Sequence, residues 1–244
     1  MSARLTLATA RRVLAQLRND RRTVAMMLVV PVLLLALLGW IYDGSPTFDR
    51  IGPPLLGIFP FIVMFLVTSV ATLRERTSGT LERLLTMPLG KGDLVVGYAL
   101  AFGVVAVVQS ALASAVAIWG LDMEIAGSPA LVVVVALANG LLGTSLGLFV
   151  SAFATSEFQA VQFLPAFILP QFLLCGLLVP RDGMPQLLGW ASDVLPLSYA
   201  VDALTTVQTT AGLTSDIAVD LLVIAVFTAV ALSAGAMTLR RRTA

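Results

Sequence analysis

Histidine is absent from the 244-residue sequence and cysteine occurs once, which excludes two common kinds of chemistry. Cys175 has no partner for a disulfide within the chain, and a metal site is implausible because zinc and copper sites are usually built from clustered histidine and cysteine. Charged residues make up only 12% of the chain, and the formal net charge is +1. Such a balance gives no reason to expect a nucleic acid partner.

Long apolar runs fill the chain instead, and the mean hydropathy of +0.96 is typical of an integral membrane protein. A bilayer core about 30 Å thick is crossed by roughly 20 apolar residues of helix. The runs are continuously apolar, whereas lipid-facing barrel strands alternate. We therefore predict an all-α membrane protein with an interfacial helix over 1–23 and a six-span domain over 24–244. The six predicted spans are about 24–42, 54–73, 94–119, 130–153, 161–179 and 219–239.

The placement of the basic residues predicts the orientation, because arginine and lysine gather in cytoplasmic loops. With both termini in the cytoplasm, thirteen of the fifteen basic residues lie on that side. Arg50 and Arg181 are the two exceptions. We therefore expect both termini, and the loop between the second and third spans, to be cytoplasmic.

That loop, residues 74–93, reads RERTSGTLERLLTMPLGKGD and carries seven charges in twenty positions. The pattern predicts a short amphipathic helix capped by Thr77 or Ser78 and ended at Pro88. A charged helix in the cytosol requires a surface to dock on, and the alternative is a helix that floats among lipid headgroups. Residues 3–22 predict a second interfacial helix, with arginines at every seventh position.

The sequence lacks the phosphate-binding motif with which a chain would use ATP by itself. Residues 85–92, LTMPLGKG, are the nearest approach to a phosphate-binding GxxxxGK[ST] loop, and they lack its first glycine and its final hydroxyl residue. All carboxylates lie in loops or at span borders, which disfavours proton coupling but leaves open a sodium site built from carbonyls and hydroxyls. We expect no enzyme activity and no cofactor on this chain, so that any ATP would be bound by a separate subunit.

Two stretches resemble type-2 ATP-binding-cassette (ABC) permeases. RERTSGTLERLLTMPL is similar to the E-R-x-x-G-T-L-E-x-L-L-x-x-P segment of their first cytosolic loop, and VLPLSYAVDAL at 194–204 is similar to the L-P-x-x-Y motif before their last span. The resemblance covers nearly the whole chain, and within the family the chain resembles bacterial drug-export permeases of the daunorubicin-resistance kind.

The resemblance implies a coupling helix seated on a cytosolic ABC ATPase subunit. It also implies two ATPase subunits carrying ATP and Mg²⁺, a second permease copy, a bacterial plasma membrane, and outward transport of hydrophobic or amphipathic drugs or lipids. The docking residues that it implies are Glu75, Arg76, Gly79, Thr80, Leu81, Glu82, Arg83 and Leu84.

Residues 180–217 are too long for a turn and too broken for a span. They predict a re-entrant helical hairpin on the outer side, because irregular backbone at membrane depth must be covered by protein or water. By the resemblance this hairpin gates the exit, with Trp190, Pro196 and Tyr199 in it; the alternative is a cap that only stabilises the fifth span.

Uncharged polar and aromatic residues within the spans are the candidates for a substrate path, although such residues more often pack between helices. The candidates are Thr68, Ser69, Asn139, Gln162, Phe163, Phe167, Gln171 and Phe172, with Gln109 and Ser110 as further polar positions. Gly143, Gly147 and Ser151 form a small-residue stripe for which packing within the subunit is the favoured interpretation.

Two other functions fit the same features. A non-transporting sensor or scaffold would use residues 74–93 to recruit a cytosolic protein, and ATP hydrolysis stimulated by cargo would exclude it. A secondary multidrug carrier would lose activity when the proton gradient collapses and would not need an ATPase.

Overall fold

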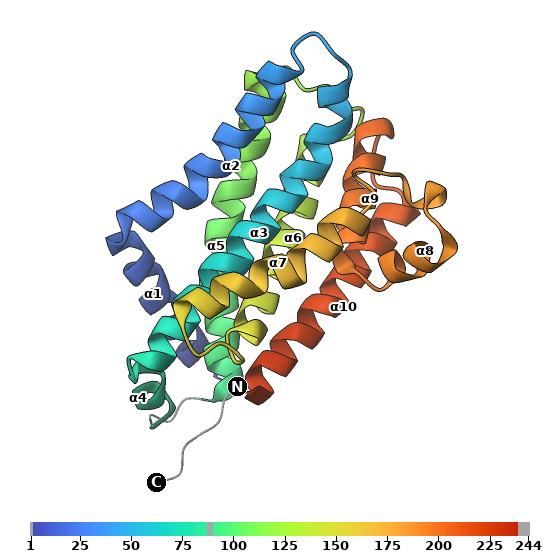
Figure 1. Ribbon diagram of the computed structural model, residues 1–244. Helices are drawn as coiled ribbons and strands as arrows, with labels where there is room; N and C mark the ends of the chain where they lie inside the picture. Colours follow the sequence, from blue (N-terminus) through green and yellow to red (C-terminus); the bar gives the residue numbers. More distant parts are fainter. Residues whose placement is uncertain (1, 87–89, 239–244) are drawn as a thin grey trace.

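The computed structural model describes residues 2–86 and 90–238, and all regular structure in those residues is helical (Figure 1), which confirms the all-α prediction. The elements are α1 (Ala3–Asn19), α2 (Arg21–Ile41), α3 (Thr47–Thr77), α4 (Thr80–Thr86), α5 (Lys91–Ala115), the π-helical turn η1 (Val116–Gly120), α6 (Pro129–Val150), α7 (Glu157–Leu174), the 3₁₀ turn η2 (Arg181–Gly183), α8 (Gln186–Asp193), α9 (Pro196–Thr209) and α10 (Ser215–Thr238).

Five helical segments of the described chain are long and apolar enough to cross a membrane: α2, α3, α5 with η1, α6 and α10. The remaining predicted span, about 161–179, corresponds to α7, which begins earlier, at Glu157, and ends earlier, at Leu174. Polar side chains enter α7 in its first two turns, among them Gln159 and Gln162. Beyond its end the chain turns at Gly176, whose φ of +94° is a conformation that glycine adopts without strain.

Helix α3 is longer than the predicted span 54–73 and has 31 residues. It continues for about one more turn through residues 74–77, which the sequence pattern places in the loop, and Ser78 caps it. Three prolines, Pro53, Pro54 and Pro60, lie in the half of α3 that is farther from α4. At 1.5 Å per residue the helix is about 46 Å long, roughly 16 Å more than a bilayer core.

The packing of α3 against α6 forms the centre of the bundle. A Cβ atom at Gly143 would lie 2.2 Å from the carbonyl oxygen of Phe61, and one at Gly147 would lie 2.5 Å from that of Phe65. Side chains at these two positions would therefore force the helices apart. The prediction that the small-residue stripe packs within the subunit is confirmed.

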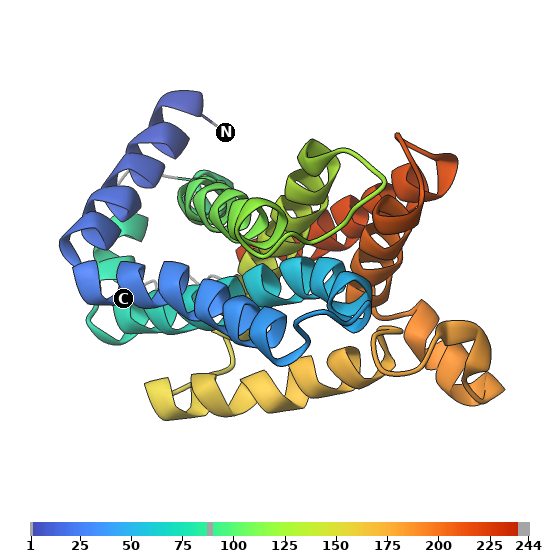
Figure 2. The same cartoon turned by 90° about the horizontal axis from the view of Figure 1, so that it is seen from above.

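Seen from above, α7 forms one edge of the bundle next to α3, and α1 and α2 form another (Figure 2). Large apolar side chains are exposed on several of these helices, for example Met26 on α2, Leu169 on α7 and Leu222 on α10. Exposed apolar faces of this kind suit contact with lipid or with another subunit.

Candidate functional site

The predicted coupling segment, residues 74–86 and called the coupling segment below, comprises the last turn of α3, the turn at Ser78 and Gly79, and α4, at one end of the bundle (Figure 1). Gly79 has a φ of +72°, in the left-handed region that favours glycine, and this turn separates the two helices. The predicted cap at Thr77 or Ser78 is wrong. The Thr77 hydroxyl donates to the Leu73 carbonyl oxygen within α3, and α4 begins only at Thr80.

Glu75 points into the protein rather than toward solvent. Its carboxylate accepts two hydrogen bonds from Arg12 of α1, with Nη1 to Oε1 at 2.8 Å and Nη2 to Oε2 at 3.2 Å. The Tyr98 hydroxyl of α5 donates to the same carboxylate, and the Arg12 guanidinium lies 5.8 Å from the Tyr98 ring centroid. Only 13% of the Glu75 side chain is exposed. A partly buried ion pair therefore joins the end of α3 to α1 and α5.

The arginines on either side of Glu75 join α3 to two further helices. Arg76 donates from Nη1 to the carbonyl oxygen of Ser151 at 2.7 Å, which supplies a positive charge at the C-terminal end of α6. Arg74 pairs with Glu157 at the start of α7, with Nε 3.0 Å from Oε1, and both of these side chains are largely exposed. Three consecutive residues thus contact four helices.

Helix α1 is docked against the start of α5, close to the coupling segment. Asp93 is 3% exposed and accepts hydrogen bonds from the Ser2 backbone N–H at 2.8 Å and from the Thr6 hydroxyl at 3.2 Å. A Cβ atom at Gly97 would lie 2.6 Å from the Cβ of Thr9, so the two helices approach closely. The α1 helix is therefore a packed part of the site.

The remaining predicted docking residues are divided between the surface and the interior. Arg83 on α4 is exposed, whereas Leu84 is partly buried and packs against a cluster that includes Ala10 and Met27 of this chain. Thr80 lies 3.0 Å from the Ser78 hydroxyl, oxygen to oxygen. The side chains of Leu81 and Glu82 lie outside the described part of the structure. Glu75 and Arg76 support the segment from within, and their contact with an ATPase stays a prediction.

The predicted path residues fall into an inner group and a group on α7. Thr68 and Ser69 of α3 are fully buried, and so is Asn139 of α6, whose Nδ2 donates to the Gly57 carbonyl oxygen at 2.8 Å. Gln109 and Ser110 of α5 are fully buried as well.

On α7, Gln162 is exposed and 40% of Phe167 is exposed. Phe163 and Phe172 pack partly against the core, and Gln171 donates to the Phe167 carbonyl oxygen at 3.0 Å. The structure therefore does not bring the predicted path residues together into one surface of the single chain.

Arg181 organises the predicted outer hairpin, whose helix α8 lies at the side of the bundle beside α9 and α10 (Figure 1). Its guanidinium pairs with Asp193 of α8 and with Asp202 of α9, and it lies 5.4 Å from the ring centroid of Tyr199. Burial lowers the pKa of Arg181, but its hydrogen bonds to the two carboxylates outweigh this effect and raise the pKa above its ordinary value. Tyr199 also donates to the Asp193 carbonyl oxygen at 2.7 Å. One cation thus fixes α8 relative to α9.

The other two predicted gate residues differ in exposure. Trp190 of α8 is 61% exposed, while Pro196 is buried at the first position of α9. Helix α9 is largely buried and packs against α10 and α3, so it belongs to the body of the bundle. Trp190 is thus the most accessible of the three predicted gate residues.

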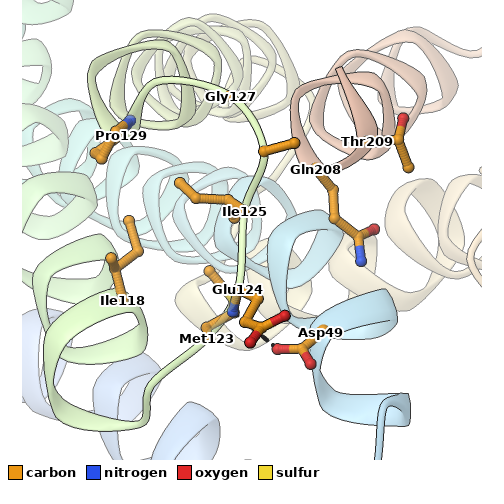
Figure 3. Close-up of a pocket in the computed structure, with 10 residues that line it drawn as sticks. Asp49, Ile118, Met123, Glu124, Ile125, Gly127, Pro129, Gln208 and Thr209 are labelled. Carbon is orange, nitrogen blue, oxygen red and sulfur yellow. Dashed lines mark hydrogen bonds between the residues drawn. The ribbon is translucent and has the colours of Figure 1, made fainter. Parts of the chain in front are cut away.

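A pocket of about 670 Å³ opens at the end of the bundle opposite α4, among α3, η1, α6 and α9 (Figure 3). Asp49 and Glu124 lie side by side at its rim, and the Glu124 backbone N–H donates to Asp49 Oδ1 at 2.9 Å. The backbone N–H of Gly127 donates to the Val207 carbonyl oxygen, also at 2.9 Å, so the loop before α6 is pinned to α9. None of the predicted site residues lines this pocket.

Sequence reasoning missed the partners of the predicted residues, chiefly Arg12, Tyr98 and Asp202. Two signals were present in the sequence. Arg12 lies outside the series of arginines that recurs at every seventh position in residues 3–22, and Tyr98 places a phenol hydroxyl in an otherwise apolar span. Neither signal identifies Glu75 as the common partner, because the contact joins residues 63 positions apart.

Comparison with known proteins assigns the family. The model of the ABC-2 type transporter family matches residues 4–209. The probable multidrug ABC transporter permease YbhR of Escherichia coli (strain K12) is 31% identical over 150 residues, which are 62% of this chain and 41% of that protein. The linearmycin resistance permease protein LnrN of Bacillus subtilis (strain 168) is 25% identical over 181 residues, which are 74% of this chain and 47% of that protein.

The ABC transporter G family member 20 of Dictyostelium discoideum is 28% identical over 161 residues, which are 66% of this chain and 22% of that protein. The chain thus spans less than half the length of each of these three relatives. The family model nevertheless covers most of the chain, from α1 to the end of α9, and the resemblance to type-2 ABC permeases is confirmed. This protein belongs to the ABC-2 type transporter family.

Proposed function

We propose that this protein is the transmembrane permease subunit of an ABC exporter that moves hydrophobic or amphipathic compounds, drugs or lipids, outward. ATP hydrolysis on a separate nucleotide-binding subunit would drive it. The names of two relatives, a multidrug permease and a linearmycin resistance permease, support a cargo of this class. The single observation that carries the proposal is the coupling segment, in which residues 74–76 join the end of α3 to α1, α5, α6 and α7 directly before the charged helix α4.

The contacts of the coupling segment account for how a movement of α4 would reach the spans. Glu75 would transmit it to α1 and α5 through Arg12 and Tyr98, and Arg76 would transmit it to α6 through Ser151. Packed helices change between discrete arrangements rather than deforming continuously, so a displacement here favours a second packing of the bundle. The exposed Arg83 is the described α4 residue that we assign to the ATPase surface.

The assembly that we propose contains two ATPase subunits, which bind ATP and Mg²⁺, and a second permease copy. The second copy would face α7, where Gln162 and Phe167 are exposed, and cargo would pass between the copies. The complex would lie in a bacterial plasma membrane with both termini of this chain in the cytoplasm, as the placement of the arginines predicts.

Co-purification from the native host tests the coupling assignment. We expect an ATPase with a Walker-type phosphate loop to co-purify with the wild-type protein and to be depleted from Arg83→Ala. Arg50→Ala is the matched control, because Arg50 is an exposed arginine at the opposite end of α3. Absence of an ATPase from the wild-type preparation under cross-linking would contradict the proposal.

Reconstituted complexes distinguish transport from the two alternative functions. Cargo such as a hydrophobic antibiotic should stimulate ATP hydrolysis in liposomes, which a scaffold would not allow. Uptake into inside-out vesicles should persist when a protonophore collapses the proton gradient. Uptake that needs the gradient and not the ATPase would indicate a secondary carrier instead.

A further inference from the structure

The junction between α1 and α2 forms an elbow (Figures 1 and 2). A hollow lies on the surface of this elbow. The hollow has a volume of about 510 Å³ and is lined by Ala15, Arg18, Asn19 and Arg21, all of which are exposed. Two guanidinium groups and one amide therefore border a concave surface. The function proposed above makes no use of these residues.

The charge around the hollow is strongly positive. Arg11 lies on the same face of α1 two turns before Arg18, and Arg22 follows Arg21 at the start of α2. Asp20 opposes these charges, but both of its oxygens accept hydrogen bonds from Thr23, at 3.2 Å from the backbone N–H and at 2.6 Å from the hydroxyl. The elbow therefore offers several exposed guanidinium groups to an anion, and its carboxylate is already satisfied within the chain.

The position of the elbow relative to the membrane indicates the kind of anion. Helix α2 has 21 residues and is about 31 Å long, so it matches the bilayer core, and a short turn connects its far end to α3. The elbow consequently lies at the membrane surface. The exposed apolar face of α2 begins one turn later, with Met26 67% exposed and Val29 57% exposed. Arginines and apolar side chains thus meet at this surface.

We propose that the elbow hollow binds the headgroup of an anionic phospholipid. Arg18 and Arg21 donate to the phosphate, since guanidinium groups match phosphate oxygens in geometry and charge. Asn19 supplies an amide donor at the rim, and the acyl chains lie along the exposed face of α2. The hollow can bind an anion, and the adjacent face of α2 can contact apolar chains. A lipid offers both groups, whereas a soluble phosphate compound offers only the anion. The site goes beyond the transport function and is measurable without an ATPase.

Native mass spectrometry of the purified protein in maltoside detergent measures the binding directly. Phosphatidylglycerol is the probe, and phosphatidylcholine with the same acyl chains is the matched zwitterionic lipid. The double variant Arg18→Gln/Arg21→Gln should weaken phosphatidylglycerol binding roughly fivefold per arginine, about 25-fold in all, as expected for arginines near an anionic headgroup. The variant Arg18→Lys/Arg21→Lys keeps the charge but loses the planar guanidinium geometry, and its phosphatidylglycerol binding should lie between that of the wild type and that of the glutamine variant.

Control variants separate a local site from diffuse attraction. Arg4→Gln/Arg50→Gln removes two exposed arginines outside the elbow and should leave phosphatidylglycerol binding within about twofold of wild type. Thermal melting confirms that each variant is folded, as exposed Arg→Gln changes on helices should allow. Inorganic phosphate at millimolar concentration should not displace the lipid.

Four results would overturn the proposal. These are equal binding of the two lipids by the wild type, unchanged binding by Arg18→Gln/Arg21→Gln, equal loss in the control double variant, and displacement of the lipid by inorganic phosphate. If the elbow variant instead loses a co-purifying ATPase and keeps the lipid, the hollow belongs to a protein interface and the lipid site is refuted.

Discussion

The pair between Arg12 and Glu75 should contribute measurably to stability, in contrast to an exposed pair of the same chemistry one residue away. The two carboxylate–guanidinium contacts are 2.8 and 3.2 Å long, and the side chains are 27% and 13% exposed. Fully exposed pairs contribute about 0–1 kcal/mol, and breaking a fully buried pair costs about 3–5 kcal/mol. We expect about 2 kcal/mol of coupling free energy for this intermediate burial.

A double-mutant cycle measures that coupling. Glu75→Gln, Arg12→Gln and the double variant are unfolded in detergent, and the free energies of unfolding are compared with the wild type. The same cycle with Arg74→Gln and Glu157→Gln is the control, because those side chains are 63% and 52% exposed. We expect less than about 1 kcal/mol of coupling for the control pair.

The functional consequence follows from the position of Glu75 between α4 and the helices α1 and α5. In the reconstituted complex, Glu75→Gln should retain the ATPase but lose most of the stimulation of hydrolysis by cargo. Additive effects of Glu75→Gln and Arg12→Gln on the free energy of unfolding would refute the argument, as would unchanged cargo stimulation in the single variants.

Three further predictions concern other parts of the bundle. Gly143→Ala should lower the free energy of unfolding by about 1–3 kcal/mol, because its Cβ would lie 2.2 Å from the Phe61 carbonyl oxygen. Gly189→Ala is the control and should not destabilise the protein, because no atom lies within 4 Å of the added Cβ. Equal melting temperatures of the two variants would contradict the packing argument. Arg181→Gln should speed amide hydrogen exchange across α8 by freeing Asp193 and Asp202, and unchanged protection would show that Arg181 does not hold the hairpin. Gly79→Ala should strain the turn before α4 by about 1–2 kcal/mol, measured as faster exchange over residues 80–86, and wild-type exchange there would argue against a left-handed requirement.

The sequence predicted the elements well where the signal is local. Continuous apolar runs identify the long helices, and Gly143 with Gly147 identifies a close helix contact, because spacing along one helix is visible in the chain itself. The motif at 74–86 likewise indicated the family. Local patterns therefore predicted the fold class and the family, and the coupling role of residues 74–86 stays a prediction.

Contacts between distant residues could not be predicted in the same way. Nothing in the pattern around Glu75 distinguishes a side chain that faces a partner protein from one that pairs with Arg12, since either would be a charged residue on a helix end. The end of α3 was predicted too early for a related reason. The charged residues after position 73 indicated the start of a loop, but Arg74 and Glu75 continue the helix because they form ion pairs with α7 and α1.

The prolines of α3 are unevenly distributed, and this affects how a displacement of α4 would move the opposite end of α3. The stretch 61–77 has no proline, so its helical hydrogen bonds are not interrupted by proline. Pro53, Pro54 and Pro60 each lack the N–H group of a helical hydrogen bond, so the other half of α3 bends more easily. Gly57 lies in the proline-containing half of α3. A Cβ atom at this position would lie 2.5 Å from Leu204 Cδ1 of α9, so α3 and α9 are in close contact here. If a bound subunit displaced α4 as proposed, α3 would bend at its proline-containing half, and the movement would reach α9 there.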